Sequence, residues 1–129
     1  MFLGLRTVCY PTADLDASKA WFTALLGFGP YFDEPFYVGY EVAGYELSLS
    51  PTMDVAEGPL TYWGVPDCDA ALARLLAAGA ELHEPVTEVG GGIRVATVVE
   101  PAGSWFGIIE NPHFALPDAP PTVGAGPGR

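Results

Sequence analysis

Few side chains of this sequence could do chemistry, and they are scattered along it. The two cysteines, Cys9 and Cys68, lack the short spacing of a Cys-x-x-Cys metal pair, so we expect buried free thiols. The two histidines, His83 and His113, fall in a loop-like, Glu-rich stretch and beyond the last predicted strand, where surface positions are expected. This leaves Glu46, within a strand-like run, as the carboxylate that could pair with a cation or act as a base.

The length and composition predict one compact domain. Half of the 129 residues are hydrophobic, which argues against disorder, and no apolar run is long enough to cross a membrane. The first residues lack the basic leader of a secretion signal, so we expect a cytoplasmic protein. The formal net charge of −11 at pH 7 argues against a nucleic-acid partner. This acidity keeps a protein soluble, and its field would also attract cationic ligands.

Two similar stretches indicate an internal duplication. The sequence reads Ala-Asp-Leu-Asp-Ala around Asp14 and Pro-Asp-Cys-Asp-Ala around Asp67, and each stretch follows a short apolar run. Asp is a favoured helix N-cap, and the Ala- and Leu-rich segments that follow end at Gly27 and Gly79. The pattern therefore predicts one helix in each half, at about 15–26 and 68–78.

Strand-like sequence fills most of the remaining chain. Runs rich in β-branched and aromatic residues predict strands at 5–10, near 28–32, 36–43 and 45–50 in the first half, and at 60–65, 81–86, 93–99 and 104–110 in the second. Each half is thus a βαβββ unit, and helices on one face of a curved sheet would leave the other face concave. From residue 116 the chain is mostly Pro, Ala and Gly, which predicts a flexible tail over 116–129.

Several short motifs, taken in order, resemble the vicinal oxygen chelate superfamily, which includes glyoxalase I, extradiol dioxygenases, fosfomycin-resistance enzymes and bleomycin-binding proteins. In the first half they are Ala13-Asp14-Leu15, Ala20-Trp21-Phe22 and Leu25-Leu26-Gly27-Phe28. In the second half they are Val65-Pro66-Asp67, Ala78-Gly79-Ala80-Glu81 and Glu100-Pro101-Ala102-Gly103. The resemblance implies an α+β domain over residues 1–115. Its two βαβββ modules, about 1–55 and 56–115, would form a curved mixed sheet around a U-shaped cleft.

The resemblance also implies four strand positions at which relatives bind a catalytic metal ion. In this sequence those positions hold Thr7, Ser48, Leu60 and Gly107. A divalent ion in such a site requires His, Glu or Gln, so we predict no metal and no other cofactor. A shift of two residues in the alignment would place Glu46 on the same face as Ser48, and would still supply only one ligand.

The residues predicted to line the cleft mix aromatic, apolar and small polar side chains, as small-molecule pockets do. They are Thr7, Cys9, Glu46, Ser48, Leu60, Tyr62, Trp105 and Gly107. Tyr62 and Trp105 could stack on a planar ligand, with space left beside Trp105 by Gly107, or they could fill the cleft as core residues. The aromatic residues at 31–40 must alternate between the two sheet faces, and the sequence does not settle which of them face the cleft.

These features predict a metal-independent small-molecule binding protein that sequesters an aromatic or cationic ligand, as bleomycin-binding proteins do. The resemblance also implies a homodimer. The alternative is a cofactor-free lyase or isomerase that acts on a small carbonyl compound, with Glu46 as its base. A third possibility is a regulatory module that has lost its ligand, which a closed and fully packed cleft would indicate.

Overall fold

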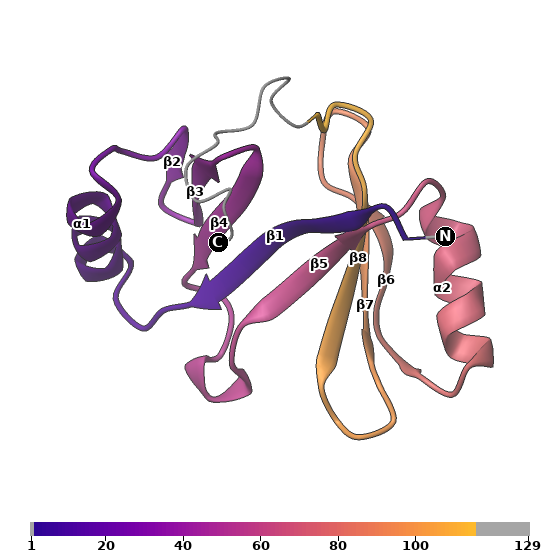
Figure 1. Cartoon of the computed structure of the whole chain (residues 1–129). Coiled ribbons are helices and arrows are strands. Elements are labelled where there is room, and N and C mark those ends of the chain that lie inside the picture. The colour runs from indigo at the N-terminus through magenta and orange to yellow at the C-terminus, as the bar shows by residue number, and fades with distance from the viewer. Residues whose placement is uncertain (1, 116–129) are drawn as a thin grey trace, which may run out of the picture.

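Eight strands form one sheet, and two helices flank it at opposite ends (Figure 1). The computed structural model describes residues 2–115. The first module consists of β1 (Gly4–Pro11), α1 (Leu15–Leu26), β2 (Phe32–Glu34), β3 (Tyr37–Val42) and β4 (Tyr45–Ser50). A 3₁₀ turn, η1 (Val55–Glu57), leads into the second module, which consists of β5 (Leu60–Gly64), α2 (Cys68–Ala77), β6 (Glu81–Glu88), β7 (Arg94–Val99) and β8 (Trp105–Glu110).

The strand order β2-β3-β4-β1-β5-β8-β7-β6 places the two modules side by side in one mixed sheet. Within each module the first strand pairs in parallel with the last, β1 with β4 and β5 with β8. The modules meet through the antiparallel pair of β1 and β5. The predicted α+β fold is therefore confirmed, and this pairing brings the first and last strands of both modules to the centre of the sheet.

Both helices begin at the predicted aspartates. The carboxylates of Asp14 and Asp67 each accept a hydrogen bond from the backbone N–H three residues further on, both at 3.1 Å. Gly27 ends α1 with a φ of 85°, a left-handed conformation that favours glycine. The second helix stops at Ala77, slightly before the predicted limit, and Gly79 follows with a φ of 105°.

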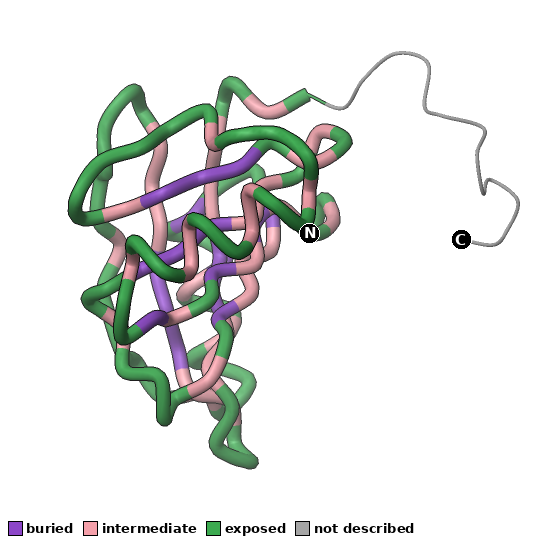
Figure 2. The backbone as a smooth tube through the Cα atoms, turned by 90° about the vertical axis from the view of Figure 1, so that its left-hand side faces the viewer, coloured by how far each residue is buried: buried purple, intermediate pink, exposed green. Residues whose placement is uncertain are grey.

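Each helix covers the strands of its own module, and a separate core lies beneath each one. The fully buried residues beneath α1 are Val38, Tyr40 and Leu49. The buried cluster beneath α2 consists of Val65, Cys68, Ala71, Ala96 and Ile108. Figure 2 shows the buried segments along the strands, while the surrounding loops are exposed. Side chains alternate between the faces of a strand, so the residues between these core positions point to the opposite face.

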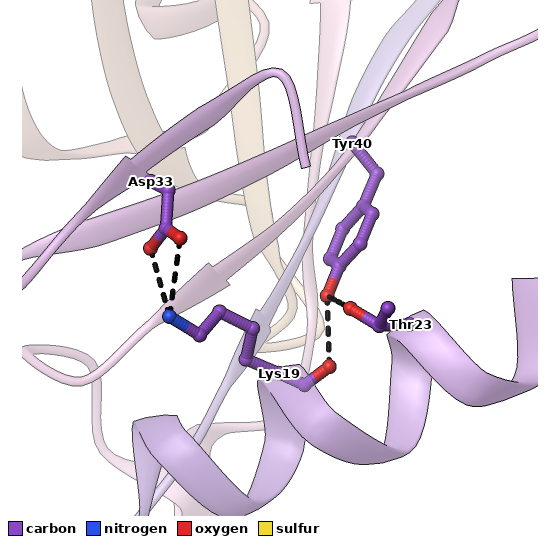
Figure 3. A network of polar contacts seen from close by, with 4 residues as sticks. All are labelled: Lys19, Thr23, Asp33 and Tyr40. Atoms are coloured by element: carbon purple, nitrogen blue, oxygen red, sulfur yellow. Dashed lines mark hydrogen bonds and ion pairs between the residues drawn. The ribbon is translucent and has the colours of Figure 1, made fainter. Parts of the chain in front are cut away.

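A polar network fixes α1 to the strands of its module (Figure 3). The side chain of Tyr40 is buried, and its hydroxyl donates to the carbonyl of Lys19 at 3.0 Å and lies 2.9 Å from the Thr23 hydroxyl. The ammonium group of Lys19 donates to both carboxylate oxygens of Asp33 in β2, at 3.0 and 3.1 Å. Because Tyr40 faces the helix, Tyr37 on the same strand faces the cleft.

The strand limits differ in places from those predicted. The strand expected near residues 28–32 begins at Phe32 instead, and β6 continues to Glu88 beyond the predicted limit at 86. Ala43 and Gly44 make the β3–β4 hairpin turn with φ values of 53° and 93°, as two-residue hairpin turns require. The predicted tail, 116–129, lies outside the described residues. No helix within residues 2–115 is both long and apolar enough to cross a membrane.

Candidate functional site

A cavity of about 790 Å³ opens on the sheet face opposite the helices. Strands of both modules line it, together with residues from the segment around η1. The aromatic residues that line it are Tyr31, Phe32, Phe36, Tyr37, Tyr62 and Trp105. A volume of this size is typical of small-molecule pockets. The cleft is therefore open rather than packed shut.

Four residues from four neighbouring strands form a row across the cleft. Thr7 on β1 pairs with Glu46 on β4 and with Tyr62 on β5, and Tyr62 pairs with Gly107 on β8. Paired residues point to the same face of a sheet, so these four positions share the cleft face. Glu46 and Gly107 each lie on the last strand of a module, beside a residue of that module's first strand.

A second row lies further along β1. Cys9 pairs there with Ser48 on β4 and with Leu60 on β5, so two of the four positions matched to the relatives' metal ligands lie in this row, and Thr7 and Gly107 lie in the first. Ser48 is fully buried, and its hydroxyl has no hydrogen-bond partner among the described residues. The Cys9 thiol lies 3.5 Å from the Met53 thioether. Burial raises the pKa of the Cys9 thiol, which makes it a weak nucleophile at neutral pH.

Glu46 accepts hydrogen bonds from three hydroxyl groups. Its Oε1 accepts from Thr7 Oγ1 at 3.0 Å and from the Tyr37 hydroxyl at 2.9 Å, and its Oε2 accepts from the Tyr31 hydroxyl at 2.5 Å. Burial and the nearby carboxylate raise the pKa of Tyr37, so this phenol remains a neutral donor. In the described part of the chain no Lys, Arg or His lies within 4.0 Å of Glu46. The carboxylate is therefore held in place by hydroxyl groups, and no described cationic side chain pairs with it.

Two glycines make the room that this row requires. A Cβ atom on Gly39 of β3 would lie 2.6 Å from Glu46 Oε2, and a Cβ atom on Gly107 would lie 2.7 Å from the Tyr62 ring. Both distances are too short for real contacts, so glycine allows the carboxylate and the ring to lie close against the neighbouring strand. The space at Gly107, predicted to lie beside Trp105, is thus filled by Tyr62.

Trp105 and His83 contribute a tilted pair of rings from the second module. Their ring centroids lie 4.2 Å apart, with an interplanar angle of 38°. His83 lies on β6, within the strand predicted at 81–86, although its Glu-rich surroundings look loop-like. Its side chain is exposed, as expected, and lines the cavity. Burial raises the pKa of Tyr62 to about 12, so its phenol stays protonated at neutral pH. This half of the cleft therefore offers ring faces and a neutral phenol, together with the carboxylate of Glu84.

The acidic residues that line the cavity are Glu46, Asp54, Glu57 and Glu84, and no Lys or Arg is among the described lining residues. Carboxylates grouped around a partly enclosed space create a negative potential that attracts cations and repels anions. Aromatic ring faces also attract cations. The described part of the cavity lining therefore combines acidic side chains with aromatic rings and contains no Lys or Arg.

The donors in the cleft do not fit a divalent metal ion. The central row offers one carboxylate, one hydroxyl and one phenol, while Gly107 offers no side chain at all. Within residues 2–115 no group of three or more His, Cys, Asp or Glu side chains is placed to hold an ion together. A divalent ion in this fold would need several imidazole or carboxylate ligands. The set present is suited to hydrogen bonding.

The cavity brings together six of the eight residues predicted to bind a ligand, which are Thr7, Cys9, Glu46, Leu60, Tyr62 and Trp105. Ser48 and Gly107 do not line it, because both are buried in the sheet. The sequence did not single out Tyr31, Tyr37 or His83 as cleft residues. Strand alternation could have placed Tyr37 once Tyr40 was assigned to the core, whereas Tyr31 lies outside the strands and His83 lies beside a register shift in β6.

The family-level comparison agrees with the fold. The family model described as Glyoxalase/Bleomycin resistance protein/Dioxygenase superfamily matches residues 4–108, which is most of the chain. The protein therefore belongs to this superfamily, which confirms the resemblance seen in the motifs. A sequence comparison with curated proteins finds no match.

Solved structures with the same fold include enzymes of different chemistry. A variant of Streptomyces coelicolor methylmalonyl-CoA epimerase in complex with 2-nitronate-propionyl-CoA is 19% identical, with a TM-score of 0.72 over 91% of this chain and 100% of that chain. A superfamily member from Vibrio splendidus 12B01 is 20% identical, with a TM-score of 0.64 over 83% of this chain and 99% of that chain.

The Mn(II)-bound glyoxalase from Novosphingobium aromaticivorans is also 20% identical, with a TM-score of 0.67 over 84% of this chain but only 39% of that chain. Identities this low support a shared fold and do not assign a reaction or a ligand to this protein. Its function must therefore be argued from its own cleft.

Proposed function

We propose that the protein binds a small cationic aromatic molecule in its cleft without a metal ion, and sequesters it. The proposal rests on Glu46, a carboxylate held by three hydroxyl donors in an aromatic cavity whose described lining has no Lys or Arg. An ionised carboxylate has about four lone-pair sites, so roughly one remains for an N–H of the ligand. The open cavity does not support the third possibility, a module with a closed and packed cleft.

The two halves of the cleft would contact different parts of such a ligand. The cationic nitrogen would pair with Glu46, because a hydrogen bond between charged groups is worth about 1.5–3 kcal/mol. The planar part would lie against Tyr62 and Trp105, which can stack on a ring and attract positive charge. Preorganisation of Glu46 by its three hydroxyl donors lowers the ordering cost of binding.

A thermal-shift screen tests this proposal. Planar cations such as tryptamine should raise the melting temperature, whereas the neutral analogue 3-ethylindole and the anion indole-3-propionate should raise it less or not at all. The increase should be the same after treatment with EDTA and after addition of Mn²⁺, Zn²⁺ or Ni²⁺. An increase that appears only with a divalent ion, or an equal preference for the anion, would contradict the proposal.

We also retain the homodimer and the cytoplasmic location as parts of this proposal. Several large apolar side chains are exposed outside the cleft, among them Trp21 and Leu25 on α1 and Leu5 on β1, with exposed fractions of 61%, 64% and 46%. Apolar surface of this kind supports an interface between subunits. Sedimentation equilibrium should give twice the mass of the chain, and a monomer at micromolar concentration would reject this part.

One observation supports the alternative of a cofactor-free isomerase or lyase. Tyr31 and Tyr37 place phenol donors on the carboxylate that would act as the base, and neutral phenols can also stabilise an enolate oxygen. In the isomerase reaction Glu46 would remove a proton from the carbon beside a carbonyl group, and the enolate so formed would take a proton from water on its opposite face, which inverts that carbon and leaves the proton of Glu46 to return to solvent. NMR in D₂O should then show deuterium at that carbon of a small carbonyl substrate, and Glu46→Gln should abolish the exchange. Exchange that persists in this variant would rule out the role of Glu46 as the base.

A further inference from the structure

A second cavity of about 220 Å³ adjoins the main one. Thr7, Tyr31, Glu46 and Asn111 line both cavities, so the two cavities meet at these residues. The main cavity has no Lys or Arg among its described lining residues, whereas Arg6 lines the small one. The two cavities therefore differ in the charge that they offer to a shared ligand.

Arg6 lies in a slot that its neighbours form. Its guanidinium carbon lies 3.7 Å from the centroid of the Phe114 ring, and its Nη1 donates to the carbonyl of Leu5 at 3.1 Å. A Cβ atom on Gly64 would lie 2.7 Å from that guanidinium carbon, so the glycine leaves the space that Arg6 occupies. A guanidinium has five N–H donors, and most of these remain available to a ligand.

The opposite charges of Arg6 and Glu46 line the same small cavity without forming an ion pair. No carboxylate of the described residues lies within 4.0 Å of Arg6. Each group is restrained by its own partners, Glu46 by three hydroxyls and Arg6 by Phe114 and Leu5. Two fixed opposite charges that do not touch are complementary to a molecule that carries both charges itself.

We propose that the small cavity receives the carboxylate of a zwitterionic ligand, which contacts Arg6 while the cationic nitrogen of the same ligand pairs with Glu46. The inference rests on the proposed function and narrows its ligand class to aromatic amino-carboxylates. The small cavity has the volume of roughly seven waters at about 30 Å³ each, enough for one carboxylate group.

A lone anion is a poorer ligand for this site than a zwitterion. Glu41 also lines the small cavity, where its carboxylate accepts the N–H of Gly44 at 2.7 Å. Together with Glu46 it repels an anion that does not bring its own positive charge. The nitrogen of a zwitterion offsets that repulsion, so the carboxylate is accepted only as part of the whole ligand.

Isothermal titration with three related probes tests the inference. L-tryptophan carries both charges, L-tryptophanamide keeps the cation and loses the carboxylate, and indole-3-propionate keeps only the carboxylate. We expect L-tryptophan to bind about tenfold or more tightly than L-tryptophanamide, the factor expected for a charged hydrogen bond, and indole-3-propionate to bind most weakly. In Arg6→Gln the ratio of the first two affinities should fall to about one.

Two further variants keep the test interpretable. Arg6→Lys retains the charge and should preserve part of the ratio even if Arg6→Gln unfolds. Arg74→Gln removes the same charge from exposed helix surface and should leave the ratio unchanged. Equal affinity of the wild type for L-tryptophan and L-tryptophanamide would reject the zwitterion site and leave the proposed function standing. If neither compound binds at millimolar concentration, both proposals are rejected.

Discussion

The two modules share one backbone arrangement, but they place different side chains at the centre of the cleft. In the first module the parallel pair of first and last strands carries Thr7 and Glu46, and in the second it carries Tyr62 and Gly107. In the first module hydroxyl groups bind the carboxylate of Glu46. In the second module the Tyr62 ring occupies the space that a side chain at Gly107 would fill. The cleft thus has a polar wall around Thr7 and Glu46 and an aromatic wall around Tyr62 and Trp105, while further rings from the first module, Tyr31, Phe32, Phe36 and Tyr37, also line the cavity.

The polar wall depends on Gly39 and the aromatic wall depends on Gly107. Alanine at one of these positions should disturb that wall and leave the other unchanged. In Gly107→Ala the new methyl group would meet the Tyr62 ring and, at 3.1 Å, the Thr61 carbonyl oxygen. Neither neighbour can move freely, so we expect a loss of about 1–3 kcal/mol in the free energy of unfolding, measured by urea denaturation. This is the largest effect that we predict.

Gly39→Ala should lower the free energy of unfolding less than Gly107→Ala does, and it should weaken ligand binding more. Its methyl group would meet Glu46 Oε2, which is the end of a flexible side chain, and then the Tyr31 ring at 3.1 Å. The carboxylate can swing away, but it then leaves the position that we assign to the cation. Gly29→Ala is the control, because nothing lies within 4 Å of its Cβ position. Equal losses of stability in all three variants would show that the two glycines make no special room.

The aromatic wall should also be visible in the pH dependence of stability. The pKa of Tyr62 is raised from 10.0 to about 12, so the folded protein keeps this proton at a pH where the unfolded chain has lost it. The resulting stabilisation is complete below pH 10 and is lost as the pH rises towards 12. As the pH rises from 10 to 12, the free energy of unfolding of Tyr62→Phe should fall by about 1–2 kcal/mol less than that of the wild type, as measured by urea titration.

Tyr45→Phe is the matched control for this pH series, since Tyr45 is 42% exposed on β4. Its stability should follow the wild type across the same pH range. If Tyr62→Phe also follows the wild type there, the phenol of Tyr62 is not buried in the way that the structure shows.

The smallest effects should come from the ion pairs that tie each helix to a strand. Lys19 on α1 pairs with Asp33 at 3.0 Å, and Arg94 on β7 pairs with Asp69 on α2 at 2.8 Å. All four side chains are at least one-third exposed. We expect Lys19→Gln and Arg94→Gln to lower the melting temperature slightly, and the difference to vanish in about 1 M NaCl, where charges are screened within about 3 Å. A difference that persists in high salt would show that packing is lost as well.

The fold was largely predictable because its signals are local. Asp14 and Asp67 cap helices through their own side chains, and alternation along 45–50 sets which residues face the core. Pairing between strands was less predictable. The resemblance matched Thr7, Ser48, Leu60 and Gly107 to one set of positions without stating which residues pair, and the register places Ser48 and Leu60 beside Cys9. Register depends on contacts between distant segments, and a single sequence does not contain these contacts explicitly.

The candidate site was predictable in part for the same reason. Glu46 was identified as a carboxylate on a strand face, and the cavity does contain it. Its partner Tyr31 lies outside any strand and reaches Glu46 across the space that Gly39 leaves open. No periodicity of the sequence indicates this contact. His83 was described as loop-like because of its Glu-rich surroundings, although it falls in the strand predicted at 81–86, and pairing with β7 places this segment in the sheet. Tertiary context overrode local propensity at these positions.

The central claim is that Glu46 binds a cation directly and needs no metal ion. Isothermal titration of EDTA-treated protein with tryptamine tests it most directly, in the wild type, in Glu46→Gln and in Glu34→Gln, an exposed carboxylate on β2. We predict binding to the wild type and to Glu34→Gln with equal affinity, and binding at least about tenfold weaker to Glu46→Gln. Unchanged affinity in Glu46→Gln, or binding that appears only after a divalent ion is restored, would contradict the account.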